Sequence, residues 1–273
     1  MSYVSPSFVS RRAPVARLPH LPALLLLLML GPGFLTGCGQ GAGDETLLAS
    51  AAANLRPVML ELGEMYAAQT GEEVAFNFAS SGKLAQQIHE GAPVDVFISA
   101  NARYVDELAA TGLVRPDTAQ VVAVGRLAVW TSGPRALSLA DLSRPEIGRI
   151  AIANPEHAPY GEAARQALQT AGLWDDVSSR LVYAENVLQA FQFVESGDVD
   201  AAIVALSQAR SAGGRWTLVD ASLHQPLQQM GVVVANSRRP EDARRFLTFL
   251  ASPQARPVWE EYGYEIPAEA ASP

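Results

Sequence analysis

Three features of the sequence predict an α/β fold with mainly parallel sheets. From residue 46 onward, short apolar runs alternate with longer amphipathic runs, the pattern of strands joined by crossover helices. The 273-residue chain is 49% hydrophobic, which is enough for one large core or two moderate ones. A glycine follows five of the helical runs, as expected where a helix ends in a left-handed residue. These glycines are Gly71, Gly91, Gly112, Gly172 and Gly197.

The N-terminal segment 1–37 has the pattern of a bacterial signal peptide. Three arginines precede the apolar run 21–30, which is shorter than the roughly 20 apolar residues of a membrane-spanning helix. The run is followed by "LTGC" at 35–38, which resembles the lipobox of bacterial lipoproteins. Cys38 is the only cysteine, so an internal disulfide is impossible and lipidation of its sulfur is the favoured interpretation. Cleavage without a lipid is the alternative.

Removal of this segment makes the chain more acidic. It takes away three arginines and no acid, so the formal charge changes from −8 to −11. An acidic exported protein is a poor candidate for binding nucleic acid, and we expect a monomer without such a partner. Residues 38–45 are small and polar, and we expect them to form a flexible tether between a lipid anchor and the folded body.

The first half of the folded body alternates three predicted strands with three predicted helices. Each β-like run leads directly into an amphipathic run. In chain order the expected elements are strand 46–53, helix 55–71, strand 73–79, helix 82–91, strand 94–100 and helix 102–113.

The second half repeats the alternation and contains two candidate crossings between lobes. Strands around 121–132 and 227–235 would connect a lobe formed by 46–124 and 226–273 to an inserted lobe, 125–225. Between and after these crossings we expect strand 148–154, helix 160–173, strand 180–184, helix 187–197, strand 200–206, a short helix at 207–213, and a helical tail at 240–264.

The turns from strand to helix offer neutral hydrogen-bond donors. Ligands of open α/β sheets gather at the carboxyl ends of the strands, and a helix N-terminus there binds anions through unpaired N–H groups. Lys83 and the exposed-looking Arg56 are the only cationic residues next to these turns, and each turn residue could also serve only as a cap or a packing group. The turn residues are Ala53, Asn54, Ser80, Ser81, Gly82, Pro159, Tyr160, Gly161, Glu185, Asn186, Val187, Ala205 and Ser207.

Catalytic and metal motifs are incomplete. Ser80 and Lys83 have the S-x-x-K spacing of penicillin-binding enzymes, but no lysine follows residue 83 to form their K-T-G strand. The same stretch fails the phosphate-binding loop pattern, because Leu84 stands where serine or threonine is required. The four histidines are scattered, so no metal site is predicted, and His157 is expected to be a turn residue.

Four long stretches of the sequence resemble the periplasmic molybdate-binding proteins of bacterial ABC transporters. The resemblance runs from about residue 47 to 264, in the order of that family. It implies a two-lobed periplasmic binding protein of type II, with two crossover strands as the hinge and a tetrahedral oxyanion, molybdate or tungstate, between the lobes. The stretches are "FASSGKLAQQIHEGAPVDVFISA", "IANPEHAPYGEAARQAL", "VYAENVLQAFQFVESGDVDAAIVALS" and "FLASPQARPVWEEYGY".

The resemblance also implies which residues hold the anion. Ser81 is expected to use its hydroxyl and its N–H, and Tyr160 and Val187 their backbone N–H groups. Asn54 falls where the family usually has serine, and either its side chain or its backbone could donate. Ala205 falls where some members have a tyrosine hydroxyl, so that side-chain bond is missing here. Supporting roles are implied for Ser80, Gly82, Gly161 and Asn186.

The predicted function is capture of an oxyanion and its delivery to a membrane permease, without catalysis or a cofactor. Neutral donors at fixed spacing would select anions by size, because a smaller anion leaves buried donors unpaired. Two alternatives stay open: a binding protein for sulfate, phosphate or an organic acid, and a lipid-anchored serine hydrolase built on Ser81. The hydrolase would need a base near this serine, for which the sequence offers only distant candidates such as His89 and His157.

Overall fold

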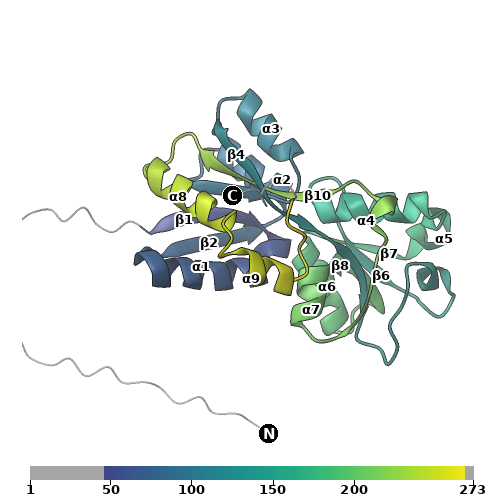
Figure 1. Cartoon of the computed structure of the whole chain (residues 1–273). Coiled ribbons are helices and arrows are strands. Elements are labelled where there is room, and N and C mark those ends of the chain that lie inside the picture. The colour runs from purple at the N-terminus through teal and green to yellow at the C-terminus, as the bar shows by residue number, and fades with distance from the viewer. Residues whose placement is uncertain (1–45, 268–273) are drawn as a thin grey trace, which may run out of the picture. The chain divides into compact units, whose positions relative to one another are not determined.

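The protein folds into two five-stranded sheets with helices packed against them (Figure 1). This computed structural model describes residues 46–267, so the predicted leader, Cys38 and the tether lie outside the described residues. The first sheet has the strand order β2-β1-β3-β10-β4 and the second β7-β6-β8-β5-β9. The strands of the first sheet are β1 (Leu47–Ala52), β2 (Val74–Ala79), β3 (Val96–Ser99), β4 (Val114–Gly125) and β10 (Leu227–Val234). Those of the second are β5 (Leu127–Thr131), β6 (Ile150–Ala153), β7 (Leu181–Ala184), β8 (Ala201–Ala205) and β9 (Arg215–Leu218).

Helices surround each sheet, and we call a sheet with its helices a lobe. Lobe I holds α1 (Arg56–Thr70), α2 (Ser81–His89), α3 (Arg103–Ala110), α8 (Pro240–Leu250), α9 (Arg256–Glu261) and the 3-10 helix η1 (Ala53–Leu55). Lobe II holds α4 (Pro159–Thr170), α5 (Trp174–Val177), α6 (Val187–Glu195), α7 (Leu206–Ser211) and the 3-10 helices η2 (Ala140–Ser143), η3 (Ser178–Arg180) and η4 (Ala221–Leu223). Among the helices of residues 46–267, none has the length and apolar character of a transmembrane span.

Both sheets are mixed, which follows from the way the chain passes between the lobes. β1 pairs in parallel with β2 and β3, as predicted for strands joined by crossover helices. The chain leaves lobe I after β4 and returns through β10, and β10 is antiparallel to both β3 and β4. In lobe II, β6 is parallel to β7 and β8, whereas β5 is antiparallel to β8 and β9. The strands that carry the crossings therefore supply the antiparallel pairs.

Two predicted elements divide in the structure. The expected strand at 121–132 is two strands in different sheets, β4 and β5, with Arg126 alone between them. The expected helical tail at 240–264 is broken after Leu250 into α8 and α9. Pro253 lies in the break, where it cannot donate the backbone hydrogen bond that a continuous helix requires.

The predicted glycine ends of the helices are confirmed. All five glycines have positive φ, between 70° and 88°, a conformation that costs a residue with a Cβ more than it costs glycine. They fix where each helix stops, and therefore where the next strand begins.

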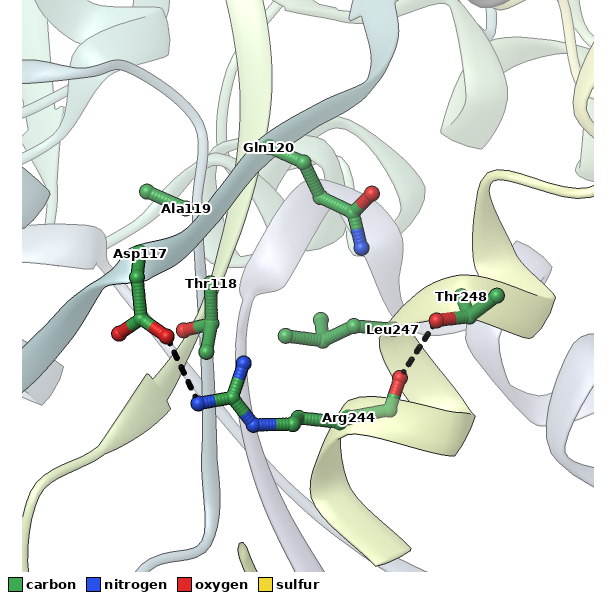
Figure 2. A pocket seen from close by; sticks show the side chains of 7 residues that line it. All are labelled: Asp117, Thr118, Ala119, Gln120, Arg244, Leu247 and Thr248. Carbon is green, nitrogen blue, oxygen red and sulfur yellow. Dashed lines mark hydrogen bonds and ion pairs between the residues drawn. The ribbon is translucent and has the colours of Figure 1, made fainter. Parts of the chain in front are cut away.

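A surface pocket of about 250 Å³ lies between β4 and α8, on the flank of lobe I (Figure 2). Arg244 reaches across it, and its Nη2 lies 2.8 Å from Oδ2 of Asp117. The Arg244 carbonyl accepts a bond from the Thr248 hydroxyl at 2.9 Å. Because the arginine is already paired with a carboxylate, this pocket is a poor anion site.

Candidate functional site

In each sheet, the paired strands end at the same level, so the predicted ligand residues that follow them lie at one edge of the sheet. β1 and β2 pair up to their last residues, so Asn54 and Ser81 follow neighbouring strand ends. β6 and β7 do the same, and they lead to the turns that carry Tyr160 and Val187. Ala205 ends β8, which is parallel to β6. All five residues are buried, with side chains no more than 4% exposed.

The two edges touch each other across the lobes. The Gly82 N–H donates to the His157 carbonyl at 2.9 Å, and the Ser80 Oγ lies 2.9 Å from the His157 Nδ1. Nearer the crossings, the Asn54 Nδ2 lies 3.5 Å from the Tyr160 hydroxyl. The lobes are therefore closed on each other in this structure.

Ser81 opens α2 and has a hydroxyl ready to donate. Its Oγ accepts the Ala100 N–H at 3.0 Å, which uses a lone pair and leaves the hydroxyl hydrogen for another acceptor. As the first residue of the helix, Ser81 also has a backbone N–H without an intrahelical acceptor. Ser80 precedes the helix in an extended conformation and makes no side-chain cap, because its hydroxyl is directed to His157.

The start of α4 packs directly over the end of β6. Pro159 occupies the first helical position, where its missing N–H is not needed. A Cβ on Gly161 would lie 2.1 Å from the Ala153 carbonyl oxygen, so only glycine allows this approach. The Tyr160 N–H belongs to the first turn of the helix and has no intrahelical partner.

Asn186 caps α6, and its bonds determine which N–H groups of the first turn have no partner in the helix. Its Oδ1 accepts the Gln189 N–H at 3.0 Å, and its carbonyl accepts the Ala190 N–H at 3.1 Å. The N–H groups of Val187 and Leu188 are left without an intrahelical acceptor. This fits a backbone role for Val187.

Ala205 contributes a buried methyl group and no side-chain donor. The following residue, Leu206, donates its N–H to the Arg126 carbonyl at 2.9 Å, and the Ser207 hydroxyl donates to the Asn54 carbonyl at 2.9 Å. The beginning of α7 is therefore bonded to the first crossing and to the β1 turn.

A buried polar network joins the lobes next to the crossings, and we call it the hinge cluster. The Asn54 Nδ2 donates to the Gln229 Oε1 at 2.8 Å and to the Tyr264 hydroxyl at 3.1 Å. The Tyr264 hydroxyl in turn donates to the Asn54 carbonyl at 2.9 Å and lies 3.2 Å from the Ser207 Oγ. An amide nitrogen has two hydrogens, and both are used here. The hinge cluster consists of Asn54, Tyr160, Ser207, Gln229 and Tyr264.

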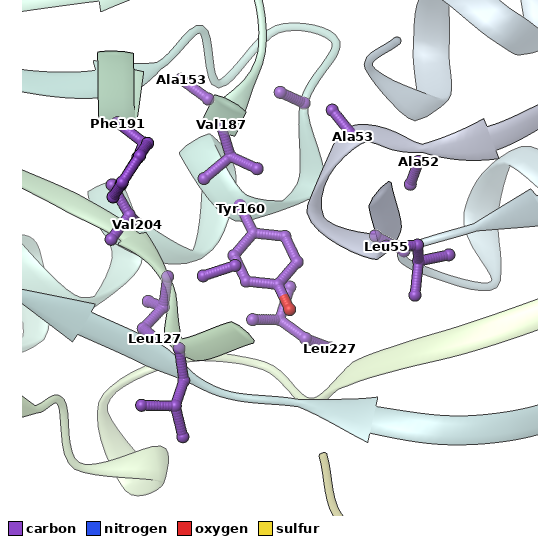
Figure 3. Close-up of a cluster of buried hydrophobic side chains, with 14 of the residues drawn as sticks. Ala52, Ala53, Leu55, Leu127, Ala153, Tyr160, Val187, Phe191, Val204 and Leu227 are labelled. Atoms are coloured by element: carbon purple, nitrogen blue, oxygen red, sulfur yellow. The ribbon is translucent and has the colours of Figure 1, made fainter. Parts of the chain in front are cut away.

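The two tyrosines of the hinge cluster are neutral hydrogen-bonding groups. Burial raises the pKa of Tyr264 to about 12. Burial, followed by the neighbouring Tyr264, raises the pKa of Tyr160 well above its usual value. Figure 3 shows the Tyr160 ring among apolar side chains, between Val187 and Leu227, with its hydroxyl on the side of Leu227. Its position explains why a Cβ on Gly125 would lie only 2.0 Å from this hydroxyl.

Sequence reasoning missed Gln229 and Tyr264, and it missed the contact that His157 makes with the other lobe. Gln229 had a detectable signal, because it alternates with Leu227 along a strand and shares that residue's buried face. Tyr264 had none, since it follows the last helix in an irregular tail. His157 was predicted to be a turn residue, and it lies in the turn between β6 and α4, but its contact with the other lobe could not be read from its neighbours in sequence.

The chemistry of the site is that of buried, uncharged donors. None of the five predicted residues has a formal charge, and the nearby ion pair Lys83–Glu185, 3.4 Å long, is about half exposed on both sides. Within residues 46–267, no group of three or more histidine, cysteine or acidic side chains could hold a metal ion. The arrangement suits an anion held by N–H and O–H groups.

Comparison with known proteins identifies the family. The model of the bacterial extracellular solute-binding protein family matches residues 47–265. The chain belongs to this family. Its members bind solutes, so this solute-binding protein is not an enzyme, which removes the serine-hydrolase alternative.

Individual relatives share about 30% of the residues over most of the chain. The molybdate-binding protein ModA of Rhodobacter capsulatus is 30% identical over 245 residues, which are 89% of this solute-binding protein and 94% of the relative. ModA of Escherichia coli is 31% identical over 84% of this chain and 92% of its own. The solved periplasmic molybdate-binding protein of Azotobacter vinelandii superposes with a TM-score of 0.78 at 31% identity, covering 81% of this chain and 99% of the other. The two-lobed type II architecture is therefore confirmed.

Proposed function

We propose that this protein captures molybdate or tungstate between its lobes and delivers the anion to an ABC transporter permease. The observation that carries the proposal is the meeting of uncharged helix starts at two facing sheet edges, in a chain whose relatives are named molybdate-binding proteins along nearly its whole length. Such donors suit an oxyanion that must later be released, because they hold it without a formal counter-charge.

Four residues are proposed to donate hydrogen bonds to the anion. Ser81 uses its hydroxyl and its N–H, while Tyr160 and Val187 use N–H groups at the starts of α4 and α6. For Asn54 we propose the backbone N–H, because both hydrogens of its side-chain amide already have acceptors in the hinge cluster. Ala205 contacts the anion only through its backbone and its methyl group, in keeping with its lack of a side-chain donor.

Selectivity follows from the spacing of these donors. A buried donor that loses its partner costs about 1–3 kcal/mol. An anion too small to reach both lobes leaves at least one donor unpaired, so we expect sulfate and phosphate to bind more weakly than molybdate. Binding of another small anion is the second candidate, and it predicts the opposite order.

The proposal includes three features that concern the whole chain. Cys38 carries a lipid that anchors the protein to a membrane, with residues 38–45 as the tether. The lobes are divided as 46–124 with 226–273, and 125–225; the strands of the two sheets support this division, except that Gly125 ends β4. The protein works as a monomer, since one chain supplies both edges of the site.

Thermal unfolding with different anions tests the function. A chain that begins at Gly39 contains every described element, and it should be heated with molybdate, tungstate, sulfate or phosphate. A ligand that binds only the folded state stabilises it by RT ln(1 + [L]/Kd), about 2.7 kcal/mol at a hundredfold excess over Kd. We expect large increases in the melting temperature with molybdate and tungstate and small ones with sulfate and phosphate. Equal shifts, or none with either metal oxyanion, would overturn the proposal.

Substitution of Ser81 tests the site. Ser81→Ala removes one donor, and the expected loss of molybdate affinity is about 1–3 kcal/mol, measured by titration calorimetry. Ser143→Ala, in η2 of lobe II, is the matched control and should bind normally. Unchanged affinity in the Ser81 variant would remove this residue from the proposed site.

A further inference from the structure

The turn that carries His157 reaches across from lobe II to the start of α2. Its backbone carbonyl accepts the Gly82 N–H at 2.9 Å, and its Nδ1 lies 2.9 Å from the Ser80 Oγ. These two bonds fall on either side of Ser81. They are therefore adjacent to the proposed anion donor of lobe I, and His157 itself lies three residues before Tyr160, a proposed donor of lobe II.

The turn is held rigidly by Asn154. The Asn154 carbonyl accepts the Ala158 N–H at 3.0 Å and the His157 N–H at 3.4 Å, and its Oδ1 accepts the Glu156 N–H at 3.0 Å. These bonds lie within the turn itself, so we expect the His157 carbonyl to keep its orientation when the lobes are apart. A preorganised acceptor loses little conformational freedom when it forms its bond.

Glycine is the only residue type that permits this contact at position 82. A Cβ at this position would lie 2.8 Å from the His157 carbonyl oxygen and 2.9 Å from the His157 Cβ. It would also lie 2.8 Å from the Tyr104 hydroxyl, in the same lobe. The φ of Gly82 is not positive, so backbone conformation does not require glycine here. Glycine is required instead by two close neighbours, His157 of the other lobe and the Tyr104 hydroxyl of the same lobe.

We propose that Gly82, Ser80 and His157 form a latch that holds the lobes closed over the bound anion and sets the rate at which the anion leaves. We call these three residues the latch. The inference rests on the proposed function and adds to it residues that position the lobes without touching the ligand. The latch must break before the anion can escape, whereas the open protein can bind an anion before the latch forms. The latch therefore acts on dissociation and leaves association unchanged.

Stopped-flow measurements of molybdate association and dissociation test the latch. Gly82→Ala should speed dissociation by about tenfold or more, as expected for the loss of one to two hydrogen bonds, with the association rate within about twofold of the wild type. Tyr104→Phe with Gly82→Ala removes the obstacle inside lobe I, and dissociation should remain fast because the obstacle at His157 is still there. A wild-type dissociation rate in Gly82→Ala would overturn the latch.

A double-mutant cycle separates the latch from a general structural effect. Ser80→Ala and His157→Ala should each speed dissociation by about three- to tenfold, and the double variant should be no faster than the faster single one. His89→Ala, at the exposed far end of α2, is the matched histidine control and should dissociate like the wild type. Additive effects of the two substitutions would show that Ser80 and His157 do not act through a common hydrogen bond, and would overturn the latch. If Gly82→Ala fails to fold, this cycle alone tests the latch. If the wild type binds none of the four anions, the proposed function is wrong. If the wild type binds molybdate and the variants dissociate at the wild-type rate, only the latch is wrong.

Discussion

The hinge cluster and the latch are two places where the lobes meet, and they differ in burial and in what can replace their contacts. In the hinge cluster, five polar side chains no more than 4% exposed bond to one another beside the crossings. In the latch, Ser80 is also buried, at 3% exposed, but His157 is only half-buried and the neighbouring Lys83 is exposed, so water can reach these bonds when the lobes separate. Buried polar groups have no such replacement, so breaking them carries the full desolvation penalty.

This difference assigns different tasks to the two regions. A rotation about a hinge moves atoms in proportion to their distance from the axis, so groups beside the crossings move least. We expect the hinge cluster to stay intact in the open and closed forms and to contribute mainly to folding stability. The latch should contribute little to stability and mainly to the lifetime of the bound state.

The largest effect is expected from Gly125→Ala. The added methyl would lie 2.0 Å from the Tyr160 hydroxyl and 3.1 Å from the Gln229 Nε2, so the hinge cluster must shift. Overpacking of this kind typically costs about 1–3 kcal/mol, and we expect the upper end, measured by urea unfolding without ligand.

Tyr160→Phe in the same chain provides the control for Gly125→Ala. It removes the oxygen that the methyl meets and should restore part of the lost free energy of unfolding. No restoration would mean that the crowding lies elsewhere.

Tyr264→Phe should lower the free energy of unfolding by about 1–2 kcal/mol, because the Asn54 amide loses an acceptor inside the protein. For a body of this size, that corresponds to a decrease in melting temperature of roughly 2–8 °C. Tyr183→Phe is the matched control, since its side chain is exposed and should cost almost nothing. If Tyr264→Phe leaves the free energy of unfolding unchanged but alters the rate of anion dissociation, the hinge cluster has the role that we assign to the latch.

Dissociation should become faster as the pH falls below about 6.5, the usual pKa of histidine. In the closed form, burial and then the charge of Lys83 lower the pKa of His157, while Glu185 and Glu156 raise it less. The open form therefore binds the proton more tightly than the closed form, and closure is favoured above the usual pKa and weakened as the pH falls through and below it.

Stopped-flow dissociation between pH 5.5 and 8 checks this dependence, and we expect an increase of several-fold toward low pH. Glutamine does not titrate in this range, so His157→Gln should remove the pH dependence of dissociation that is due to the latch. Any pH dependence that remains is due to protonation of the anion. Identical profiles for the two proteins would exclude His157 as the titrating group.

The smallest effect is expected from Lys83→Ala. Its ion pair with Glu185 bridges the lobes, but both side chains are about half exposed, and such pairs are typically worth less than about 1 kcal/mol. Dissociation should change by less than about twofold and lose this contribution in high salt. A tenfold change would make Lys83 part of the latch.

Much of the fold could be predicted because periodicity and glycine mark local structure. The strand and helix that flank Ser81 follow from such signals, and Gly91 marks where that helix stops. The division of 121–132 at Arg126 could not be predicted, since both halves are apolar and only long-range pairing places them in different sheets.

The candidate site was predictable to a similar extent. The turns with Asn54, Ser81 and Tyr160 were found from strand ends, but the partners of the Asn54 amide were not. Gln229 is 175 residues away in the chain and Tyr264 is 210. Hydrogen bonds between such distant residues depend on tertiary geometry and leave no local pattern.

Lys83, the exposed residue beside the latch, is a site for selective chemical labelling. Lys83 is the only lysine among the 273 residues, and its amine stands within 3.4 Å of the opposite lobe when the lobes are closed. Apart from the amino terminus, an amine-reactive dye therefore has a single target, located at the line where the lobes separate. A dye attached to this amine would report the separation of the lobes, and with it the binding of the proposed anion, without a substitution in the sequence.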